Sequence, residues 1–433
     1  MKIKNFNKLA KSDLRKNALV IVEAGLLAID TKQAIQKGIQ LKFDSLFINN
    51  KEFPLKKVEN IFVVGVGKCA ASSAEALETI LGERISGGVV IDVCSPPNLK
   101  YIDFYQGTHP FPSDINKKAT NDIISLLNKA DKNDLVIFVI SGGGSTLLHY
   151  SKDVSPSEEE RVMKRLFEVG ANIEEINTIR KHISLGRGGY LAKHAYPARS
   201  VSLIFSDVPS NDIQFIASGP TVKDKTTIRD AEAVLKKYEI LKKCSIENWR
   251  PLETPKDDKY FEKVENILFI SNKTALSAMN KKAEELGYNS EIRDTHLTGE
   301  ARIVGVEIIK ELHNCSAGTV LLYGGETTVT IKKKGKGGRT QELALSSLQE
   351  MEGDELLLAF ASDGWDNTRH AGALCDKITK EKAKEIGLDP VECLDQNRSF
   401  AFFEKTGNYL ETGFTGSNVA DLILAIKAKE LGD

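Results

Sequence analysis

Short apolar runs alternate with amphipathic segments along most of the chain. From Leu14 to Leu41 apolar residues recur every three or four positions, so the chain is expected to open with one or two helices. Buried strands are predicted by apolar runs at Ile61–Gly67, Gly88–Val93, Leu135–Ile140 and Ser200–Phe205. A helix is predicted from about Cys69 to Leu81. This alternation indicates an α/β fold, with a mostly parallel sheet covered by helices on both faces.

A polar stretch rich in Pro and Lys, residues 242–259, separates this pattern from a second one. The second pattern predicts strands at Asn266–Ile270, Thr319–Tyr323, Thr327–Lys332 and Leu356–Ala361. It predicts helices near Thr274–Leu286, Thr298–Leu312 and Gln341–Met351. We therefore predict a first domain over residues 1–240 and a second over residues 260–433. A last helix is predicted over Ser417–Leu431 and could pack on either domain.

Length and composition narrow the class of protein. A chain of 433 residues exceeds the roughly 100–200 residues of one ordinary core, so two or three domains are expected. A net charge of -1 argues against a protein that coats nucleic acid. No apolar run approaches the roughly 18 residues of a membrane span, and no secretory signal is evident. The six cysteines form no C-x-x-C pair, which argues against a zinc cluster. We expect a cytoplasmic monomer or homodimer that acts on a small molecule.

Glycine-rich loops follow two of the predicted strands, at the sheet edge where α/β proteins bind ligands. Gly65-Val-Gly-Lys68 opens a helix whose first amides attract anions, and Lys68 suits a phosphate or carboxylate. The same segment could be only a tight packing turn. It also matches a dinucleotide fingerprint, Gly65-x-Gly67-x-x-Ala70, with Asp92 ending the next strand.

The second glycine-rich loop, residues 141–146, is the stronger indication of an anion-binding site. Successive amides could cradle an anion in a loop formed by Ser141, Gly142, Gly143, Gly144, Ser145 and Thr146. A flexible turn is the alternative. The sequence contains no G-x-x-x-x-G-K-[ST], which excludes a Walker-type phosphate loop.

Acidic, basic and histidine side chains occupy other loops. Asp207 and Asp363 each follow a strand, where a carboxylate could bind Mg²⁺ or simply cap a turn. Glu326 could bond a ribose hydroxyl or belong to a hairpin. Five of the eight residues 332–339 are basic, and of these Arg339 precedes a helix and could clamp a phosphoryl group. His109 and the loop residue His182 could contact substrate or form only structural hydrogen bonds.

The ordered set of motifs resembles the type II glycerate kinases, the glycerate 2-kinase family whose C-terminal part is called MOFRL. The resemblance covers nearly the whole chain. It rests on Gly65-Val-Gly-Lys-Cys-Ala, His109-Pro-Phe-Pro, Ser141-Gly-Gly-Gly-Ser, Lys181-His-Ile-Ser, Ser206-Asp-Val, Gly324-Gly-Glu-Thr-Thr-Val, Gly338-Arg-Thr-Gln-Glu-Leu-Ala, Ser362-Asp-Gly and Thr412-Gly-Phe-Thr-Gly-Ser-Asn.

The resemblance implies ATP-dependent, Mg²⁺-assisted phosphorylation of D-glycerate to 2-phosphoglycerate. It implies a Rossmann-like first domain, a smaller α/β second domain with a mixed sheet, and an active site in the cleft between them. Catalytic roles are then expected for Lys68, Arg339 and Asp207. Substrate binding is expected for Lys68, His109, Lys181 and Arg339, and metal binding for Asp207 and Asp363. Nucleotide binding is expected for the loop from Ser141 to Thr146 and for Gly325, Glu326 and Thr327.

This chain departs from the family pattern in several places. Pro209-Ser-Asn-Asp stands where the family has a Gly-Asp-Asp type stretch, and Arg187-Gly-Gly replaces Lys-Gly-Gly. After Ser362-Asp-Gly the usual D-G-P-T-D-A-A-G-A is shortened, and Arg369 and His370 stand where an acid is expected. Arg369 is therefore expected to add a cation to the substrate pocket. A kinase of a related sugar acid, a nicotinamide-dependent hydroxypyruvate reductase and a non-catalytic sensor remain alternatives.

Overall fold

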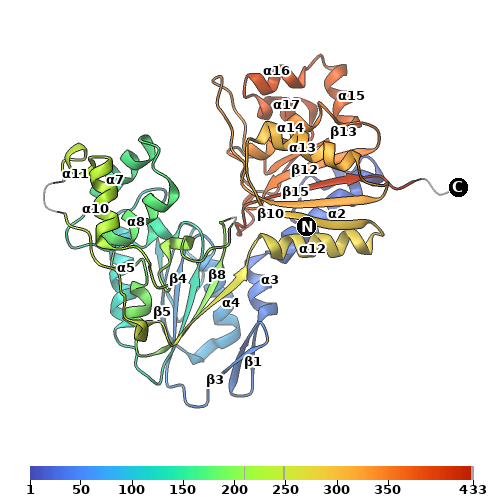
Figure 1. Ribbon diagram of the computed structural model, residues 1–433. Helices are drawn as coiled ribbons and strands as arrows, with labels where there is room; N and C mark the ends of the chain where they lie inside the picture. Colours follow the sequence, from blue (N-terminus) through green and yellow to red (C-terminus); the bar gives the residue numbers. More distant parts are fainter. Residues whose placement is uncertain (209, 247–248, 431–433) are drawn as a thin grey trace. The chain divides into compact units, whose positions relative to one another are not determined.

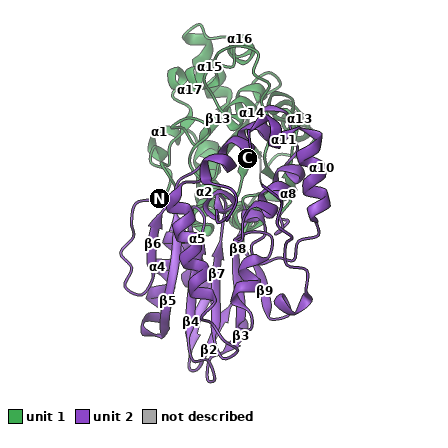
Figure 2. Ribbon diagram, turned by 90° about the vertical axis from the view of Figure 1, so that its left-hand side faces the viewer, with its two compact units in different colours: residues 1–30, 207–210, 270–433 green, residues 31–206, 211–269 purple. Residues whose placement is uncertain are grey.

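The computed structural model describes residues 1–208, 210–246 and 249–430, which form two compact units (Figure 2). Unit 1 comprises residues 1–30, 207–210 and 270–433, and unit 2 comprises residues 31–206 and 211–269. These units do not follow the predicted boundaries at the N-terminus, because residues 1–30 group with the C-terminal half. Pro209, part of one predicted departure from the family pattern, and Leu431, the end of the predicted last helix, lie outside the described residues. The helices of the described part are all too short or too polar to cross a membrane.

Unit 2 is built on a six-stranded sheet (Figure 1). Its strands lie in the order β6-β5-β4-β7-β8-β9 (Figure 2). Its strands are β4 (Ile61–Val66), β5 (Ile85–Asp92), β6 (Asp103–Gln106), β7 (Leu135–Ile140), β8 (Arg199–Phe205) and β9 (Val264–Ile270). The pairings from β6 through β8 are all parallel. Every residue of β4 and β7 is buried, as expected for central strands of a covered parallel sheet. The strand predicted for the second domain at Asn266–Ile270 thus belongs to this first sheet instead.

Helices surround this sheet, and three of them begin with reciprocal side-chain caps. The helices are α3 (Thr31–Gly38), α4 (Ala70–Leu81), α5 (Asp114–Leu127), α6 (Gly144–Leu147), α7 (Pro156–Glu168), α8 (Ile173–Ile183), α9 (Tyr190–Ala195), α10 (Ile228–Lys237) and α11 (Ile240–Lys243). Capping boxes start α7, α8 and α10. A small antiparallel sheet adds β1 (Ile39–Lys42), β2 (Ser45–Ile48) and β3 (Lys51–Pro54).

Unit 1 contains a mixed sheet in the order β10-β11-β15-β12-β13-β14. Its strands are β10 (Asn289–Leu297), β11 (Thr319–Gly325), β12 (Glu355–Ala361), β13 (Gly372–Asp376), β14 (Tyr409–Leu410) and β15 (Asp421–Lys427). The β10–β11 pair is parallel and the other pairs are antiparallel.

Two predictions for this unit are wrong. The predicted last helix is β15, which lies between β11 and β12, because a short run buried on both faces fits a central strand as well as a helix. The predicted strand Thr327–Lys332 is irregular, with one isolated bridge between Glu300 and Thr328. Only Thr327 of this segment is buried, so it has no continuous buried face to fix a sheet register.

The helices of unit 1 include two from the chain's N-terminus. They are α1 (Phe6–Leu9), α2 (Asp13–Ala28), α12 (Asn272–Glu285), α13 (Ala301–His313), α14 (Arg339–Ser347), α15 (Lys377–Glu385), α16 (Pro390–Asp395) and α17 (Ser399–Thr406). A Cβ on Gly25 of α2 would lie 2.7 Å from the Met279 side chain of α12, so glycine lets these helices pack closely. The buried Arg15 guanidinium forms two hydrogen bonds to Asp376, at 2.7 and 2.6 Å.

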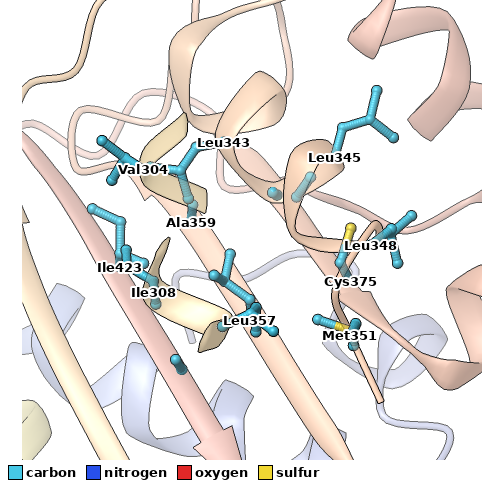
Figure 3. Close-up of a cluster of buried hydrophobic side chains, with 14 of the residues drawn as sticks. Val304, Ile308, Leu343, Leu345, Leu348, Met351, Leu357, Ala359, Cys375 and Ile423 are labelled. Carbon is cyan, nitrogen blue, oxygen red and sulfur yellow. The ribbon is translucent and has the colours of Figure 1, made fainter. Parts of the chain in front are cut away.

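A large apolar cluster joins α13 and α14 to the sheet of unit 1 (Figure 3). Val304 and Ile308 of α13 and Leu343 of α14 pack against Leu357 of β12 and Ile423 of β15. The first residue of α14, Arg339, therefore stands on a helix that is anchored to the sheet by buried side chains.

Candidate functional site

In unit 2, two loops meet at the carboxyl ends of the adjacent strands β4 and β7. The backbone N–H of Lys68 donates to the carbonyl of Gly142 at 2.9 Å, and the Ser141 hydroxyl accepts from the N–H of Cys69 at 3.3 Å. Gly67 has a φ of +116°, and a Cβ there would lie 2.2 Å from the Ser141 hydroxyl oxygen. Only glycine permits this approach. The two glycine motifs of the sequence thus form one structure.

The side chain of Lys68 lies over the second loop. Gly143 has a φ of +83°, and a Cβ there would lie 3.2 Å from Cγ of Lys68 and 3.5 Å from Cδ2 of His109. The hydroxyls of Ser145 and Ser218 are 2.9 Å apart, and Ser218 donates to Asn177 at 2.8 Å. Backbone amides, a lysine, a histidine and hydroxyls therefore surround the same loop.

Thr146 has a supporting position at the end of this loop. Its hydroxyl donates to the carbonyl of Pro110 at 3.2 Å, and its side chain is buried. Thr146 therefore holds the His109–Pro110 segment against the loop, and its predicted role in nucleotide binding stays a prediction.

Arg180 is a cation of this site that the sequence did not reveal. Asn177 of α8 contacts Ser218, and Arg180 lies three residues later on the same helical face. The Nε atom of Arg180 is buried and has no hydrogen-bond partner within the described residues. Partial burial and the charges of Lys68 and Arg180 lower the pKa of His109 to about 4. His109 is therefore neutral near pH 7, between two cations.

The residues that follow Arg180 have structural partners. Lys181, predicted to bind substrate, is buried, and its Nζ lies 3.0 Å from Asp224. His182 lies in α8 rather than in a loop, and its Nδ1 is 2.8 Å from the carbonyl of Thr178. Both Arg180 and Lys181 lie one turn after Asn177, but Lys181 is paired internally, whereas the charge of Arg180 acts on His109. No pattern in the sequence distinguished the two residues.

Asp92 is occupied by backbone amides. It accepts hydrogen bonds from the N–H groups of Ala71 at 3.0 Å and Val93 at 2.6 Å, and its side chain is buried. Burial raises the pKa of this carboxyl. Because one carboxylate oxygen supports the first turn of α4 and the other the loop after β5, this arrangement does not favour the ribose contact of a dinucleotide fingerprint.

In unit 1, Arg339 is held by two carboxylates. Its Nε and Nη2 donate to Asp421 at 2.5 and 3.2 Å, and its Nη2 also donates to Glu326 at 2.7 Å. Burial alone would lower the pKa of Arg339, but the two carboxylates outweigh it and raise the pKa. The guanidinium is therefore fixed in one orientation, and the carboxylates of Asp421 and Glu326 balance its positive charge.

Asp421 owes its position to strand direction. It begins β15, which is antiparallel to both neighbours, and it is in register with Gly325 of β11 and Ala361 of β12. The start of β15 thus lies beside the ends of two other strands. Burial raises the pKa of Asp421 against the influence of Arg339. The sequence did not reveal Asp421, because this segment was predicted as a helix.

Asp366 caps the helix that carries Arg339. It accepts from the N–H groups of Thr340 at 3.2 Å and Gln341 at 2.9 Å, and a Cβ on Gly338 would lie 2.2 Å from its carboxylate. A buried acid at a helix N-terminus stabilises the unpaired amides there. Gly338 is required because the carboxylate lies directly against the chain.

A cavity of about 650 Å³ lies beside these groups in unit 1. Its lining includes Thr327, Val329, Ile331, Arg339, Glu342, Trp365, Asp366, Asn367, Asn397 and Asp421. Of the predicted nucleotide-binding residues of this unit, Thr327 lines the cavity, Glu326 binds Arg339, and Gly325 ends β11.

The shortened loop after Ser362 does not place its two unusual residues in this cavity. Arg369 is exposed and binds Glu404 at 2.7 Å. His370 is buried, lies 3.0 Å from the same carboxylate, and stacks on Tyr409 at 3.9 Å between ring centroids. The expected extra cation is therefore paired with α17 rather than directed into the cavity.

The predicted metal ligands are placed at strand ends. Asp207 follows β8 and is half-buried, while Asp363 follows β12 and accepts from the N–H of Trp365 at 2.9 Å. Within the described ranges, no group of three or more His, Cys, Asp or Glu side chains is arranged to hold a metal ion. Binding of Mg²⁺ by these two aspartates stays a prediction.

Comparisons with known proteins match nearly the whole chain. Residues 17–252 match the family model described as a domain of unknown function, DUF4147, and residues 319–421 match the MOFRL family. A glycerate 2-kinase of Pyrococcus horikoshii is 36% identical over 97% of this chain and 99% of its own. A D-glycerate 2-kinase of Thermotoga maritima is 35% identical over 95% of this chain and 98% of its own. The crystal structure of a Thermotoga maritima glycerate kinase matches with a TM-score of 0.84, at 34% identity over 95% of this chain and 99% of that one. The chain therefore belongs to the glycerate 2-kinase family, with a DUF4147 region followed by a MOFRL region.

Proposed function

We propose that this protein transfers the terminal phosphoryl group of ATP to the 2-hydroxyl of D-glycerate. The observation that supports this most directly is the cationic site of unit 2. Lys68 lies over the loop of residues 141–146, beside a neutral His109 whose pKa is lowered by burial and by the charges of Lys68 and Arg180. Positive charge beside a glycine-rich loop at the end of a strand favours an anion, and both glycerate and ATP are anions.

The individual roles follow from what phosphoryl transfer requires, which is positioning and neutralisation of charge. Lys68 acts as a compact charge on the transferring group, and the glycines of the 141–146 loop let phosphate oxygens approach the backbone closely. Arg180 and His109 bind the acceptor carboxylate, Arg180 by charge and His109 by a hydrogen bond. Mg²⁺, when bound by Asp207 and Asp363, supplies charge neutralisation on the phosphates.

Arg339 differs from Lys68 because two carboxylates hold its side chain in place. Asp421 and Glu326 fix the plane of its guanidinium, so its remaining N–H donors have one direction. We assign Arg339 to stabilising the oxygens on which charge develops during transfer. A preoriented donor needs no reorganisation at the moment of reaction, which is why such groups contribute strongly to rate.

Hydroxypyruvate reduction is the competing function, and two Agrobacterium vitis relatives at 34% and 33% identity are named as candidate hydroxypyruvate reductases. A nicotinamide cofactor in unit 2 would need an acid free for its ribose. Asp92, the acid at the expected position, is instead bound to the amides of Ala71 and Val93. Kinase activity is the better supported function.

The decisive experiment determines which hydroxyl is phosphorylated. Purified protein, ATP, Mg²⁺ and D-glycerate are coupled to enolase with phosphoglycerate mutase left out. Direct formation of phosphoenolpyruvate is the expected result, because enolase accepts 2-phosphoglycerate. A signal that appears only after mutase is added would mean transfer to the 3-hydroxyl. Reduction of hydroxypyruvate by NADH or NADPH without any ATP-dependent product would replace the kinase proposal.

A further inference from the structure

The cavity of unit 1 is lined by an exposed aromatic side chain and apolar residues. The indole of Trp365 is 58% exposed, and Val329 and Ile331 also line the cavity. An indole left this accessible beside a cavity of about 650 Å³ suits a flat ring, since ligand sites measure roughly 300–1,000 Å³. A planar aromatic ligand can stack on it in the offset geometry that π-systems prefer.

The charges of this cavity argue against an anionic occupant. Arg339 is the one cation among its described lining residues, and it is already shared between Asp421 and Glu326. Two further lining acids have partners of their own. Asp366 binds the amides of α14, and Glu342 lies 3.0 Å from Arg302. The cavity therefore offers one guanidinium, already shared with two carboxylates, and not the several positive charges that would be needed to hold a whole triphosphate.

The polar groups of the cavity suit an uncharged ligand that offers hydrogen-bond donors. Carboxylates, threonine hydroxyls and the exposed Asn367 contribute acceptors along its wall. Among the reactants of the proposed reaction, the nucleoside part of ATP is uncharged, contains a flat base, and carries ribose hydroxyls and an amino group as donors.

We propose that this cavity binds the nucleoside part of the phosphate donor, with the base stacked on Trp365. The inference rests on the proposed kinase function and adds the place of the base to it. Stacking on an aromatic side chain tolerates any purine, because every base presents a π-face. The protein is therefore expected to accept GTP with only modest loss relative to ATP.

The two tryptophans of the chain make a direct test possible. Trp249 is buried among the helices of unit 2, whereas Trp365 is exposed in unit 1, so Trp249→Phe leaves an emission that reports on Trp365 alone. Adenosine, ADP and D-glycerate are titrated separately into this variant. We expect quenching by ADP and by adenosine, and little change with glycerate. Trp365→Phe with Trp249 intact is the matched control and should show no comparable quenching.

Steady-state kinetics distinguish a Trp365 that stacks on the nucleotide base from a Trp365 that only supports the fold. Trp365→Ala should raise the KM for ATP about tenfold while the KM for glycerate stays within twofold, and Trp365→Phe should restore most of the ATP affinity because it keeps an aromatic face. Quenching by glycerate instead of ADP, or an unchanged KM for ATP in Trp365→Ala, would overturn the inference. Failure of the wild-type protein to phosphorylate glycerate would count against the proposed function, whereas an active kinase whose Trp365 ignores nucleotides would count against this inference alone.

Discussion

Replacing Arg339 tests whether its charge acts on the reaction or only on Asp421. Arg339→Met should lower kcat by roughly 10²–10³-fold if the guanidinium stabilises developing charge. The same change leaves the buried Asp421 carboxyl without its cation, which typically costs about 3–5 kcal/mol of unfolding free energy. Because burial already raises the pKa of Asp421, the carboxyl can take up a proton, and we expect the lower end of that range.

The double variant Asp421→Asn with Arg339→Met separates the two effects. Removing both charges of a buried pair is often nearly neutral, so its unfolding free energy should return to within about 1–2 kcal/mol of wild type. Its kcat should nevertheless stay 10²–10³-fold low, in the range expected for loss of the guanidinium. Urea denaturation gives the stability, and the enolase-coupled assay gives kcat.

Two outcomes would refute this reasoning. Recovery of kcat together with stability in the double variant would make Arg339 a structural partner of Asp421. A well-folded Arg339→Met protein that keeps kcat within about threefold of wild type would remove Arg339 from the reaction altogether. Asp421→Asn alone serves as the control, because it keeps the guanidinium and its bond to Glu326.

Three further predictions concern unit 2. Lys68→Met should lower kcat by roughly 10²–10³-fold with a much smaller change in ATP affinity by calorimetry, and a kcat within about threefold of wild type would contradict its role. Arg180→Met should raise the pKa of His109 above about 4, as followed by NMR, because one of the two cations that lower it is gone; an unchanged pKa would place Arg180 away from the loop. The buried Glu159 of α7 lies 2.8 Å from Arg187 and 2.5 Å from His149. Burial opposes ionisation of Glu159, but these two partners outweigh burial and lower its pKa from 4.5 to about 2, so its stabilisation is complete above pH 4.5 and is lost as pH falls toward 2. Glu159→Gln should therefore cost about 3–5 kcal/mol at pH 7 and flatten that acid decline. The matched control Glu160→Gln, at a half-buried neighbour paired with the exposed Lys164 at 2.7 Å, should cost less than about 1 kcal/mol. Equal effects of the two variants in urea denaturation would refute this.

The sheet of unit 2 was predictable because its central strands are short and apolar throughout. The run Leu135–Ile140 was predicted with the bounds that β7 has, since a strand buried on both faces needs no alternation. The same property made β15 ambiguous, because a run without a period fits a helix equally well. Sequence alone could not assign β9 to the correct sheet. Its position after the predicted domain boundary suggested the second domain, whereas in the folded protein it lies beside β8.

The loops of the site were predictable from their position after strands, but their partners were not. Lys68 and Gly143 lie in motifs that a strand-end argument identifies, and the structure brings them together. Asp421 became visible only through strand direction, and Arg180 only through the effect of its charge on His109. Lys181 shows the opposite error, since a motif residue one place away from Arg180 is bound internally by Asp224.

The ion pair between Arg15 and Asp376 has a consequence for the order in which the protein can assemble during translation. The helix with Arg15 leaves the ribosome first, but the strand that ends at Asp376 follows 361 residues later. At about 5–20 residues per second, this helix waits on the order of 20–70 s for the partner of its buried arginine. Residues 31–269, which include all of unit 2, are synthesised in the interval. A fragment that begins after residue 30 would leave Asp376 buried without its arginine, so the C-terminal half cannot reproduce its native packing alone.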